Sequence, residues 1–279
     1  MKKWLIFPAL FFALCVHSQS EKQTLGPRLT NTALYLDPTE VQTFGSLTGL
    51  LDKNLTENQY IPFAFGGSQS IYGKQISEDK AWELFAEFGV FTQFEWLIVE
   101  GQQQRNLINA DYKAAISYAR QVNAQWTYRL RFFHVSSHLG DDYIIRNSIN
   151  NYTQNKVNYE QLEISFFYLL DENIRLNAGL GSVVRPDALR LPFSFHLGAN
   201  HNQWTKPKGW GLSYGWLLKG MQENDFTPGI KLGIGLAYFT AHKKEPLRIL
   251  LEYYTGHLPY SQFEKGRIEW LGLGMYFYL

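Results

Sequence analysis

The sequence predicts an all-β protein, a transmembrane antiparallel up-and-down β-barrel of about 12 strands. First, polar and apolar residues alternate one by one through successive segments, which is the period of a strand with two different faces. Second, these segments are about ten residues long, the length that crosses a bilayer when a strand is tilted. Third, the chain carries 20 Phe, 17 Tyr and 8 Trp, and many of these rings end a segment, as in the aromatic girdles of membrane barrels.

The alternation is clearest from Val122 to Phe132, where every even position is apolar and every odd position is polar. Similar segments recur to the end of the chain. Because such barrels have an even number of strands, the less regular segment near residues 41–51 is expected to be the twelfth strand. The expected strands lie near residues 41–51, 61–72, 80–94, 107–118, 121–134, 157–170, 173–184, 191–200, 209–219, 229–240, 246–256 and 265–279.

A soluble β-sandwich would also alternate, so the polar faces decide between the two folds. Strands of soluble proteins average about five or six residues, which is shorter than these segments. The polar positions are rich in glycine and carry isolated charges, which suits the crowded interior of a barrel. These charges are expected to form a network that fills the interior rather than a selectivity filter, with His196 as a structural residue among them. They are Arg129, Arg131, Glu163, Arg175, Lys219, Lys231, Arg248 and Glu252.

The N-terminus has the pattern of a secretory signal peptide. Lys2 and Lys3 precede an apolar run from Trp4 to Val16, and residues 1–18 are expected to be cleaved. A lipid anchor on Cys15 is disfavoured because the bulky Leu14 precedes it. Residues 19–60 are expected to form an N-terminal segment, and residues 61–279 are expected to form the main part of the barrel. The expected location is the bacterial outer membrane, with its lipids as partners. The net charge of +1 indicates no nucleic-acid partner.

The expected orientation places one polar cluster at the outer rim. If the last strand runs inward, Ala119-Arg120 and Asp171-Glu172 become short periplasmic turns and residues 135–156 a long outer loop. The stretch FFHVSSHLGDDY (132–143) then lies just past the membrane-spanning part of its strand. His134 and Ser136 continue the lipid-facing parity of that strand.

Two interpretations of this cluster follow from its residues alone. As a rim turn, Ser136 and Ser137 would bond to backbone groups, Gly140 would take a positive φ, and Asp141 or Asp142 would cap the loop. As a metal site, His134 or His138 would join the two aspartates. An imidazole with carboxylates suits zinc, and carboxylates alone suit a divalent cation such as calcium. The metal-ligand candidates are His138, Asp141 and Asp142.

Four stretches resemble the DUF1207 family of uncharacterised bacterial proteins. They are NADY (109–112), HVSSHLGDDY (134–143), LEYYTGHLPYSQF (251–263) and the closing GLG (272–274). The resemblance extends over most of the mature chain, and Asp142 stands where a glutamate is expected. It implies an outer-membrane barrel and supplies no activity.

A second, local resemblance is to the outer-membrane phospholipase A and lipid A deacylase barrels. Both have a His-x-Ser pair on an outward-facing strand near the outer leaflet. The resemblance implies that His134 is a general base and Ser136 a nucleophile, with a third group to orient the histidine. The phospholipases use an asparagine on the following strand and the deacylases a glutamate. The candidates named for this role are Asn147, Asn150 and Asn151.

Two functions therefore compete. One is a hydrolase of an acyl ester in phospholipid or lipopolysaccharide. The other is a non-enzymatic barrel, either a pore for small solutes or a structural or partner-binding protein. The direction in which His134 and Ser136 point, and the presence of an Asn or acid near the histidine, distinguish them.

Overall fold

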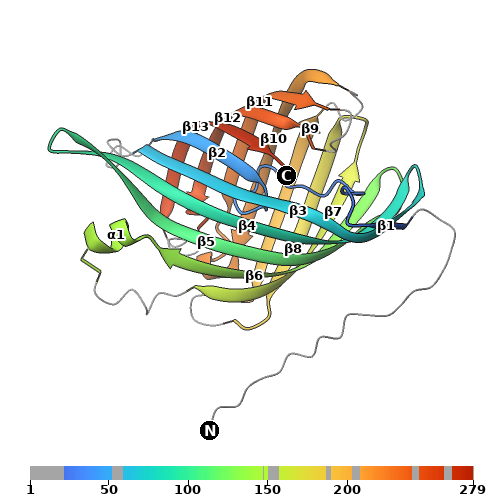
Figure 1. Ribbon diagram of the computed structural model, residues 1–279, viewed down its shortest axis with the longest axis horizontal. Helices are drawn as coiled ribbons and strands as arrows, with labels where there is room; N and C mark the ends of the chain where they lie inside the picture. Colours follow the sequence, from blue (N-terminus) through green and yellow to red (C-terminus); the bar gives the residue numbers. More distant parts are fainter. Residues whose placement is uncertain are drawn as a thin grey trace, which may run out of the picture.

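The computed structural model describes residues 22–51, 59–146, 148–149, 157–186, 190–202, 208–240, 245–260 and 266–278. Its strands form one sheet of 13, and all except β1 close into an antiparallel barrel of 12 (Figure 1). This confirms the predicted fold class. The barrel strands are β2 (Thr43–Leu50), β3 (Gln59–Ser77), β4 (Lys80–Val99), β5 (Gln102–Gln121), β6 (Trp126–Leu139), β7 (Asn158–Leu169), β8 (Ile174–Val183), β9 (Phe193–Asn202), β10 (Gly209–Met221), β11 (Gly229–Phe239), β12 (Leu247–His257) and β13 (Arg267–Phe277).

All twelve predicted strands are present, but several are longer than expected. Strand β3 has 19 residues, and β4 and β5 have 20 each. The hairpin of β4 and β5 extends well beyond the other strands (Figure 1). Its far part carries polar residues such as Gln102 and Gln104, which break the alternation of hydrophobicity. Backbone pairing continues there, so apolar periodicity marks only part of each strand.

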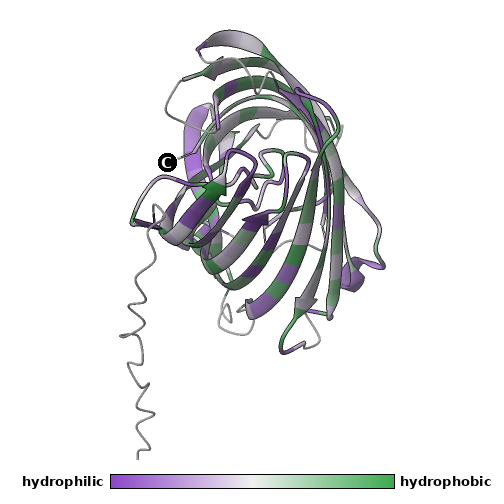
Figure 2. Cartoon of the chain, turned by 90° about the vertical axis from the view of Figure 1, so that its right-hand side faces the viewer, coloured by the Kyte–Doolittle hydropathy of each residue, from purple (hydrophilic) through white to green (hydrophobic). Residues whose placement is uncertain are grey.

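The two faces of the sheet have the predicted composition. Leu271, Leu273 and Met275 on β13 are exposed on the outside, whereas Glu252 on β12 and Arg248 are buried inside. Hydrophilic and hydrophobic bands alternate along the strands (Figure 2). In a soluble protein so many exposed large apolar side chains would be unfavourable. In a barrel whose outer face meets lipid, they are the expected surface.

The connections divide the barrel into a turn end and a loop end. At the turn end, the β5–β6 and β7–β8 turns are stabilised by the same pattern of hydrogen bonds from backbone N–H groups to a side-chain oxygen. The side-chain oxygen of Asn123 accepts hydrogen bonds from the N–H groups of Gln125 and Trp126, at 3.0 and 2.8 Å. The carboxylate of Asp171 likewise accepts hydrogen bonds from the N–H groups of Asn173 and Ile174. These backbone donors hold the pKa of Asp171 below its usual range. This corrects one predicted turn, because Ala119-Arg120 lies within β5 and the turn is at residues 122–125.

The loop end carries the longer connections. The β6–β7 connection contains the short helix α1 (Asp141–Arg146), and the β10–β11 connection contains the 3₁₀ helix η2 (Gln222–Asn224). Arg146 forms an ion pair with Glu95 on β4, which holds α1 against the β4–β5 hairpin. Among the described residues, no helix is long and apolar enough to cross a membrane.

Residues 25–42, called here the inner segment, run from the turn-end rim, where Leu25 is 70% exposed, into the barrel interior. The segment follows β1 (Lys22–Thr24), which pairs with β3 at the turn end. It reaches Asp37 inside the lumen and returns to the start of β2. Tyr35, Leu36 and Val41 are at most 3% exposed and pack with residues of the barrel wall, including Leu250 and Tyr276. The chain's own N-terminal part therefore lies inside the barrel.

Buried ion pairs join the inner segment to the wall. Glu40 lies 2.7 Å from a guanidinium nitrogen of Arg129 and 2.8 Å from one of Arg131. Arg131 also contacts Glu87 at 3.1 Å, and Arg129 contacts Glu163 at 3.2 Å. Charges removed from water are strongly unfavourable unless they are paired and hydrogen-bonded. The predicted interior charge network is thus confirmed, with the inner segment supplying one of its central carboxylates.

Candidate functional site

The histidines and serines of the polar cluster lie on a strand and not in a rim loop. Strand β6 continues through Leu139, paired with β5 from Gln121↔Thr127 to Asn109↔Leu139. His134, Ser136 and His138 share the outer face with Phe132, which is 47% exposed. The predicted lipid-facing direction of His134 and Ser136 is therefore what the structure has, with the strand ending later than residue 134. Polar side chains do not end a strand when both neighbouring strands still offer backbone partners.

His134 has a carboxylate partner on the next strand. It stands directly opposite Glu160 of β7 in the sheet register. Its Nδ1 lies 3.1 Å from Glu160 Oε1, and the two side chains are 42% and 38% exposed. A ring N–H that donates from Nδ1 to a carboxylate leaves Nε2 as the basic nitrogen. This is the arrangement by which an acid orients a catalytic histidine.

Ser136 bonds to a different histidine from the predicted one. Its Oγ lies 3.2 Å from Nε2 of His138. The His138 ring also meets the ring of Tyr112 edge-on, with the centroids 5.9 Å apart. The serine therefore has one histidine on each side along the same face of β6. One is oriented by Glu160 and the other is in hydrogen-bond contact with the hydroxyl.

The odd residues of the cluster point inward and are structural. Ser137 is 2% exposed and donates its hydroxyl to Asp111 Oδ1, which also accepts from the amide of Asn109 at 3.1 Å. The rim-turn interpretation is wrong for Ser137 and for Gly140, which does not have a positive φ. A side chain at Gly140 would overlap the backbone carbonyl of Leu107. The glycine is thus required by close approach of two strands.

The two aspartates lie in the first turn of α1. The Leu107 N–H points toward Asp142 Oδ2 at 3.5 Å, and burial raises the pKa of the neighbouring Tyr143. Among the described residues, no three His, Cys, Asp or Glu side chains lie close enough together to hold a metal ion. Metal binding by His138, Asp141 and Asp142 stays a prediction. The proposed third catalytic residues, Asn147, Asn150 and Asn151, lie outside the described residues.

Glu160 is the functional candidate that sequence reasoning missed. A signal for it was present, because position 160 has the lipid-facing parity of the predicted strand 157–170, where a charged side chain is unfavourable. What was lacking was the register between β6 and β7, which places residue 160 opposite residue 134. Register depends on the length and path of the connecting loop, and hydrophobic periodicity does not report it.

Comparison with known proteins now places the chain. The model of a family described as "Protein of unknown function (DUF1207)" matches residues 30–279. The chain belongs to the DUF1207 family. This confirms the resemblance drawn from the four stretches. This DUF1207 protein has no match among curated protein sequences.

Solved structures similar to this DUF1207 protein include two outer-membrane phospholipases. The enzyme of Salmonella typhi, solved as a dimer with bound calcium, is 11% identical with a TM-score of 0.57, and the match covers 84% of this chain and 90% of that one. The outer membrane phospholipase A of Escherichia coli is also 11% identical with a TM-score of 0.57, covering 85% and 97%. At this identity the likeness shows a common outer-membrane-type barrel fold and nothing finer.

Proposed function

We propose that this DUF1207 protein is a bacterial outer-membrane hydrolase that cleaves acyl esters of membrane lipids, with Ser136 as the nucleophile. The observation that carries the proposal is the contact between His134 Nδ1 and Glu160 Oε1 on the lipid-facing surface, two residues from a serine. A histidine–carboxylate pair on a face that meets lipid is unfavourable for folding. Its position beside a hydroxyl supports a catalytic role.

The residues divide the chemistry in the following way. Glu160 holds the His134 ring with Nε2 directed away from the carboxylate. Ser136 lies on the same face of β6, and rotation about its χ1 moves the hydroxyl from His138 towards His134. His134 takes the serine proton as Oγ attacks the ester carbonyl carbon, and then returns it to the leaving alcohol. Water repeats the sequence on the acyl-enzyme and releases the fatty acid.

The location of the site selects the substrate class. His134 and Ser136 lie in the half of β6 nearer the loop end, which corresponds to the outer leaflet if longer loops are external. A hydroxyl on the outside of a barrel meets lipid directly. Acyl esters lie between the headgroups and the chains, so an ester of phospholipid or lipid A reaches Ser136 without entering the lumen. The fold shared with two phospholipases supports this assignment.

The divalent cation predicted from the sequence, such as calcium, would be held by His138, Asp141 and Asp142. The described donors do not come together as a set of three, so no step is routed through a metal. The pore alternative has less support, because the inner segment lies within the lumen and packs against its wall. A structural barrel without activity is the outcome that the following experiment would establish instead.

The test is hydrolysis of labelled lipid by purified protein in detergent micelles. Fluorescent phospholipid and lipid A are assayed separately, and release of fatty acid is expected with one of them. Ser136→Ala should abolish release. Ser182→Ala is the matched control, because Ser182 is an exposed strand serine on β8 without a described histidine contact. No release by the wild type from either lipid, or full activity of Ser136→Ala, would refute the proposed function.

A further inference from the structure

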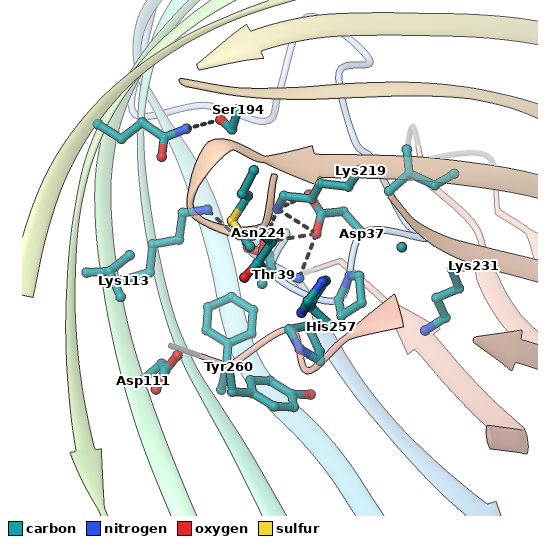
Figure 3. Close-up of a pocket in the computed structure, with 18 of the residues that line it drawn as sticks. Asp37, Thr39, Asp111, Lys113, Ser194, Lys219, Asn224, Lys231, His257 and Tyr260 are labelled. Atoms are coloured by element: carbon teal, nitrogen blue, oxygen red, sulfur yellow. Dashed lines mark hydrogen bonds and ion pairs between the residues drawn. The ribbon is translucent and has the colours of Figure 1, made fainter. Parts of the chain in front are cut away.

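A small cavity lies inside the barrel towards the loop end. Its volume is about 80 Å³. Asp37, Pro38 and Thr39 of the inner segment line one side, and the inner faces of β5, β6 and β7 line another. The ends of β10 and β12 complete it, with residues of η2 (Figure 3). The cavity is separated by the barrel wall from the outward-facing Ser136, so it is a different place from the proposed catalytic site.

Lys113 is a buried cation in this cavity without a carboxylate partner. It is 5% exposed. Its ammonium donates to the carbonyl oxygen of Thr39 at 3.0 Å and lies 4.1 Å from the centre of the Phe133 ring. Within the described residues no carboxylate oxygen comes within 4.0 Å of it. A buried charge normally has a charged partner, because desolvation is otherwise uncompensated.

The other charged groups around the cavity are already engaged. Lys219 pairs with Asp37 at 3.0 Å, and Lys231 pairs with Glu252 at 3.1 Å. Glu163 contacts Arg129 and Arg131, and Asp111 accepts hydrogen bonds from Ser137 and Asn109. Figure 3 shows Lys113 and Lys219 reaching towards Thr39 from opposite sides. Lys113 is therefore the lysine of this cavity whose ammonium has no ion pair within the described residues.

Three further polar atoms, on residues that line the cavity, lack a hydrogen-bond partner within the described part of the chain. They are the Tyr260 hydroxyl, the Asn224 amide nitrogen and Nδ1 of His257. Tyr260 is 1% exposed and Asn224 8%. Nearly all buried polar groups in folded proteins are hydrogen-bonded, so these groups can offer hydrogen bonds to an occupant of the cavity. The hydroxyl and the amide nitrogen are donors, as is the ammonium of Lys113.

We propose that this cavity binds a small oxyanion, a phosphate or carboxylate group, through Lys113 with Tyr260 and Asn224 as additional donors. A buried ammonium in a cavity that Tyr260 and Asn224 also line is complementary to such a group, and lysine commonly binds phosphate as a point charge. The cavity volume limits the occupant, because water takes about 30 Å³ in the liquid. The site has room for an inorganic ion or for the charged end of a larger molecule. Because Lys113 also holds Thr39, a bound anion would stabilise the inner segment.

The proposal is tested by calorimetric titration of the purified, folded barrel in phosphate-free detergent buffer. Inorganic phosphate, acetate and sn-glycerol 3-phosphate are titrated separately. Binding is expected for at least one of them. Tighter binding of glycerol phosphate than of phosphate assigns the anion to a lipid headgroup, and the reverse order assigns it to a free ion. Each ligand is titrated up to about 10 mM, which detects even weak binding. Absence of binding for all three would overturn the proposal.

Two variants and a matched control locate the binding. Lys113→Met removes the charge at similar length and should weaken binding at least about tenfold, a typical loss for a charge-assisted contact. Tyr260→Phe removes only the hydroxyl and should weaken it less. Lys80→Met makes the same charge change on an exposed residue at the turn end and should bind like the wild type. Equal binding by Lys113→Met and the wild type would contradict the assignment.

Thermal unfolding distinguishes a folded variant that has lost the anion site from a misfolded variant. Removing an unpaired buried charge should leave the protein folded, with an unliganded Tm at or above that of the wild type. The bound anion should raise the Tm of the wild type and leave that of Lys113→Met unchanged. A Tm rise of the same size in both proteins would show that the ion acts elsewhere.

Discussion

His134 and Glu160 face each other across β6 and β7 on the outside of the barrel, with Nδ1 3.1 Å from Oε1. The two residues are 26 positions apart in the chain. A polar pair in this position is unfavourable for folding, because apolar residues would suit the lipid-facing side better. The first two predictions follow from this contact.

Glu160→Gln should lower the kcat of lipid hydrolysis by about 10- to 1000-fold with little change in KM. The amide keeps the size of the side chain, but it no longer stabilises the imidazolium that forms when His134 takes the serine proton. Steady-state kinetics on the labelled lipid measure the effect. Glu172→Gln at the exposed β7–β8 turn is the control for loss of one negative charge. A Glu160→Gln enzyme with wild-type kcat would remove Glu160 from the mechanism.

His134→Asn and His138→Asn should differ in their effect on kcat. We expect a loss of about 100-fold or more for His134→Asn, since general-base catalysis contributes about that much, and a smaller loss for His138→Asn. The serine is hydrogen-bonded to His138, so this comparison is decisive. The reverse order of the two losses would transfer the role of base to His138.

The wild-type barrel should conduct no measurable ionic current in planar lipid bilayers. The inner segment occupies the lumen and is held by Lys219 on Asp37 and by Arg129 and Arg131 on Glu40. Asp37→Asn combined with Glu40→Gln removes both attachments, and intermittent conductance is expected as the segment moves. Glu78→Gln with Asp79→Asn, at the β3–β4 turn, carries the same charge change without touching the lumen. Steady conductance of the wild type would contradict the closed interior.

Gly140→Ala should destabilise the protein by about 1–3 kcal/mol, the usual cost of overpacking. The added carbon would overlap the Leu107 carbonyl, and a backbone has no rotamer with which to move away. Gly45→Ala is the matched control, because a side chain there would meet only Phe63 at 3.9 Å. Urea unfolding of both variants gives the difference. Equal urea midpoints for the two variants would show that the backbone at residue 140 can move away from residue 107 without cost.

The two ends of β6 show where the hydrophobic pattern of the sequence no longer predicts the structure. The predicted strand 121–134 begins at residue 126 and continues to residue 139. Asn123 forms a turn that its place in an alternating run does not reveal. At the other end, polar side chains replace apolar ones while backbone pairing with β5 persists. Periodicity of hydrophobicity reports the environment of side chains, and strand ends depend on backbone hydrogen bonds.

The site shows the same division. The shared face of His134 and Ser136 follows from their spacing of two, because alternate residues of a strand point the same way. The partners that the structure gives them were not predicted. Glu160 comes from another strand, and the serine turns to His138 instead of His134.

The amino-acid sequence by itself determined that this chain is an outer-membrane-type barrel of twelve strands, which side chains face outward, and which charges lie inside. These properties depend on periods of two along the chain, and such periods are local. Tertiary structure alone decided that the inner segment enters the lumen, that Glu40 joins two arginines, and that Glu160 meets His134. Each of these depends on strand register and on the path of a connection through space, which bring together residues that no local pattern links.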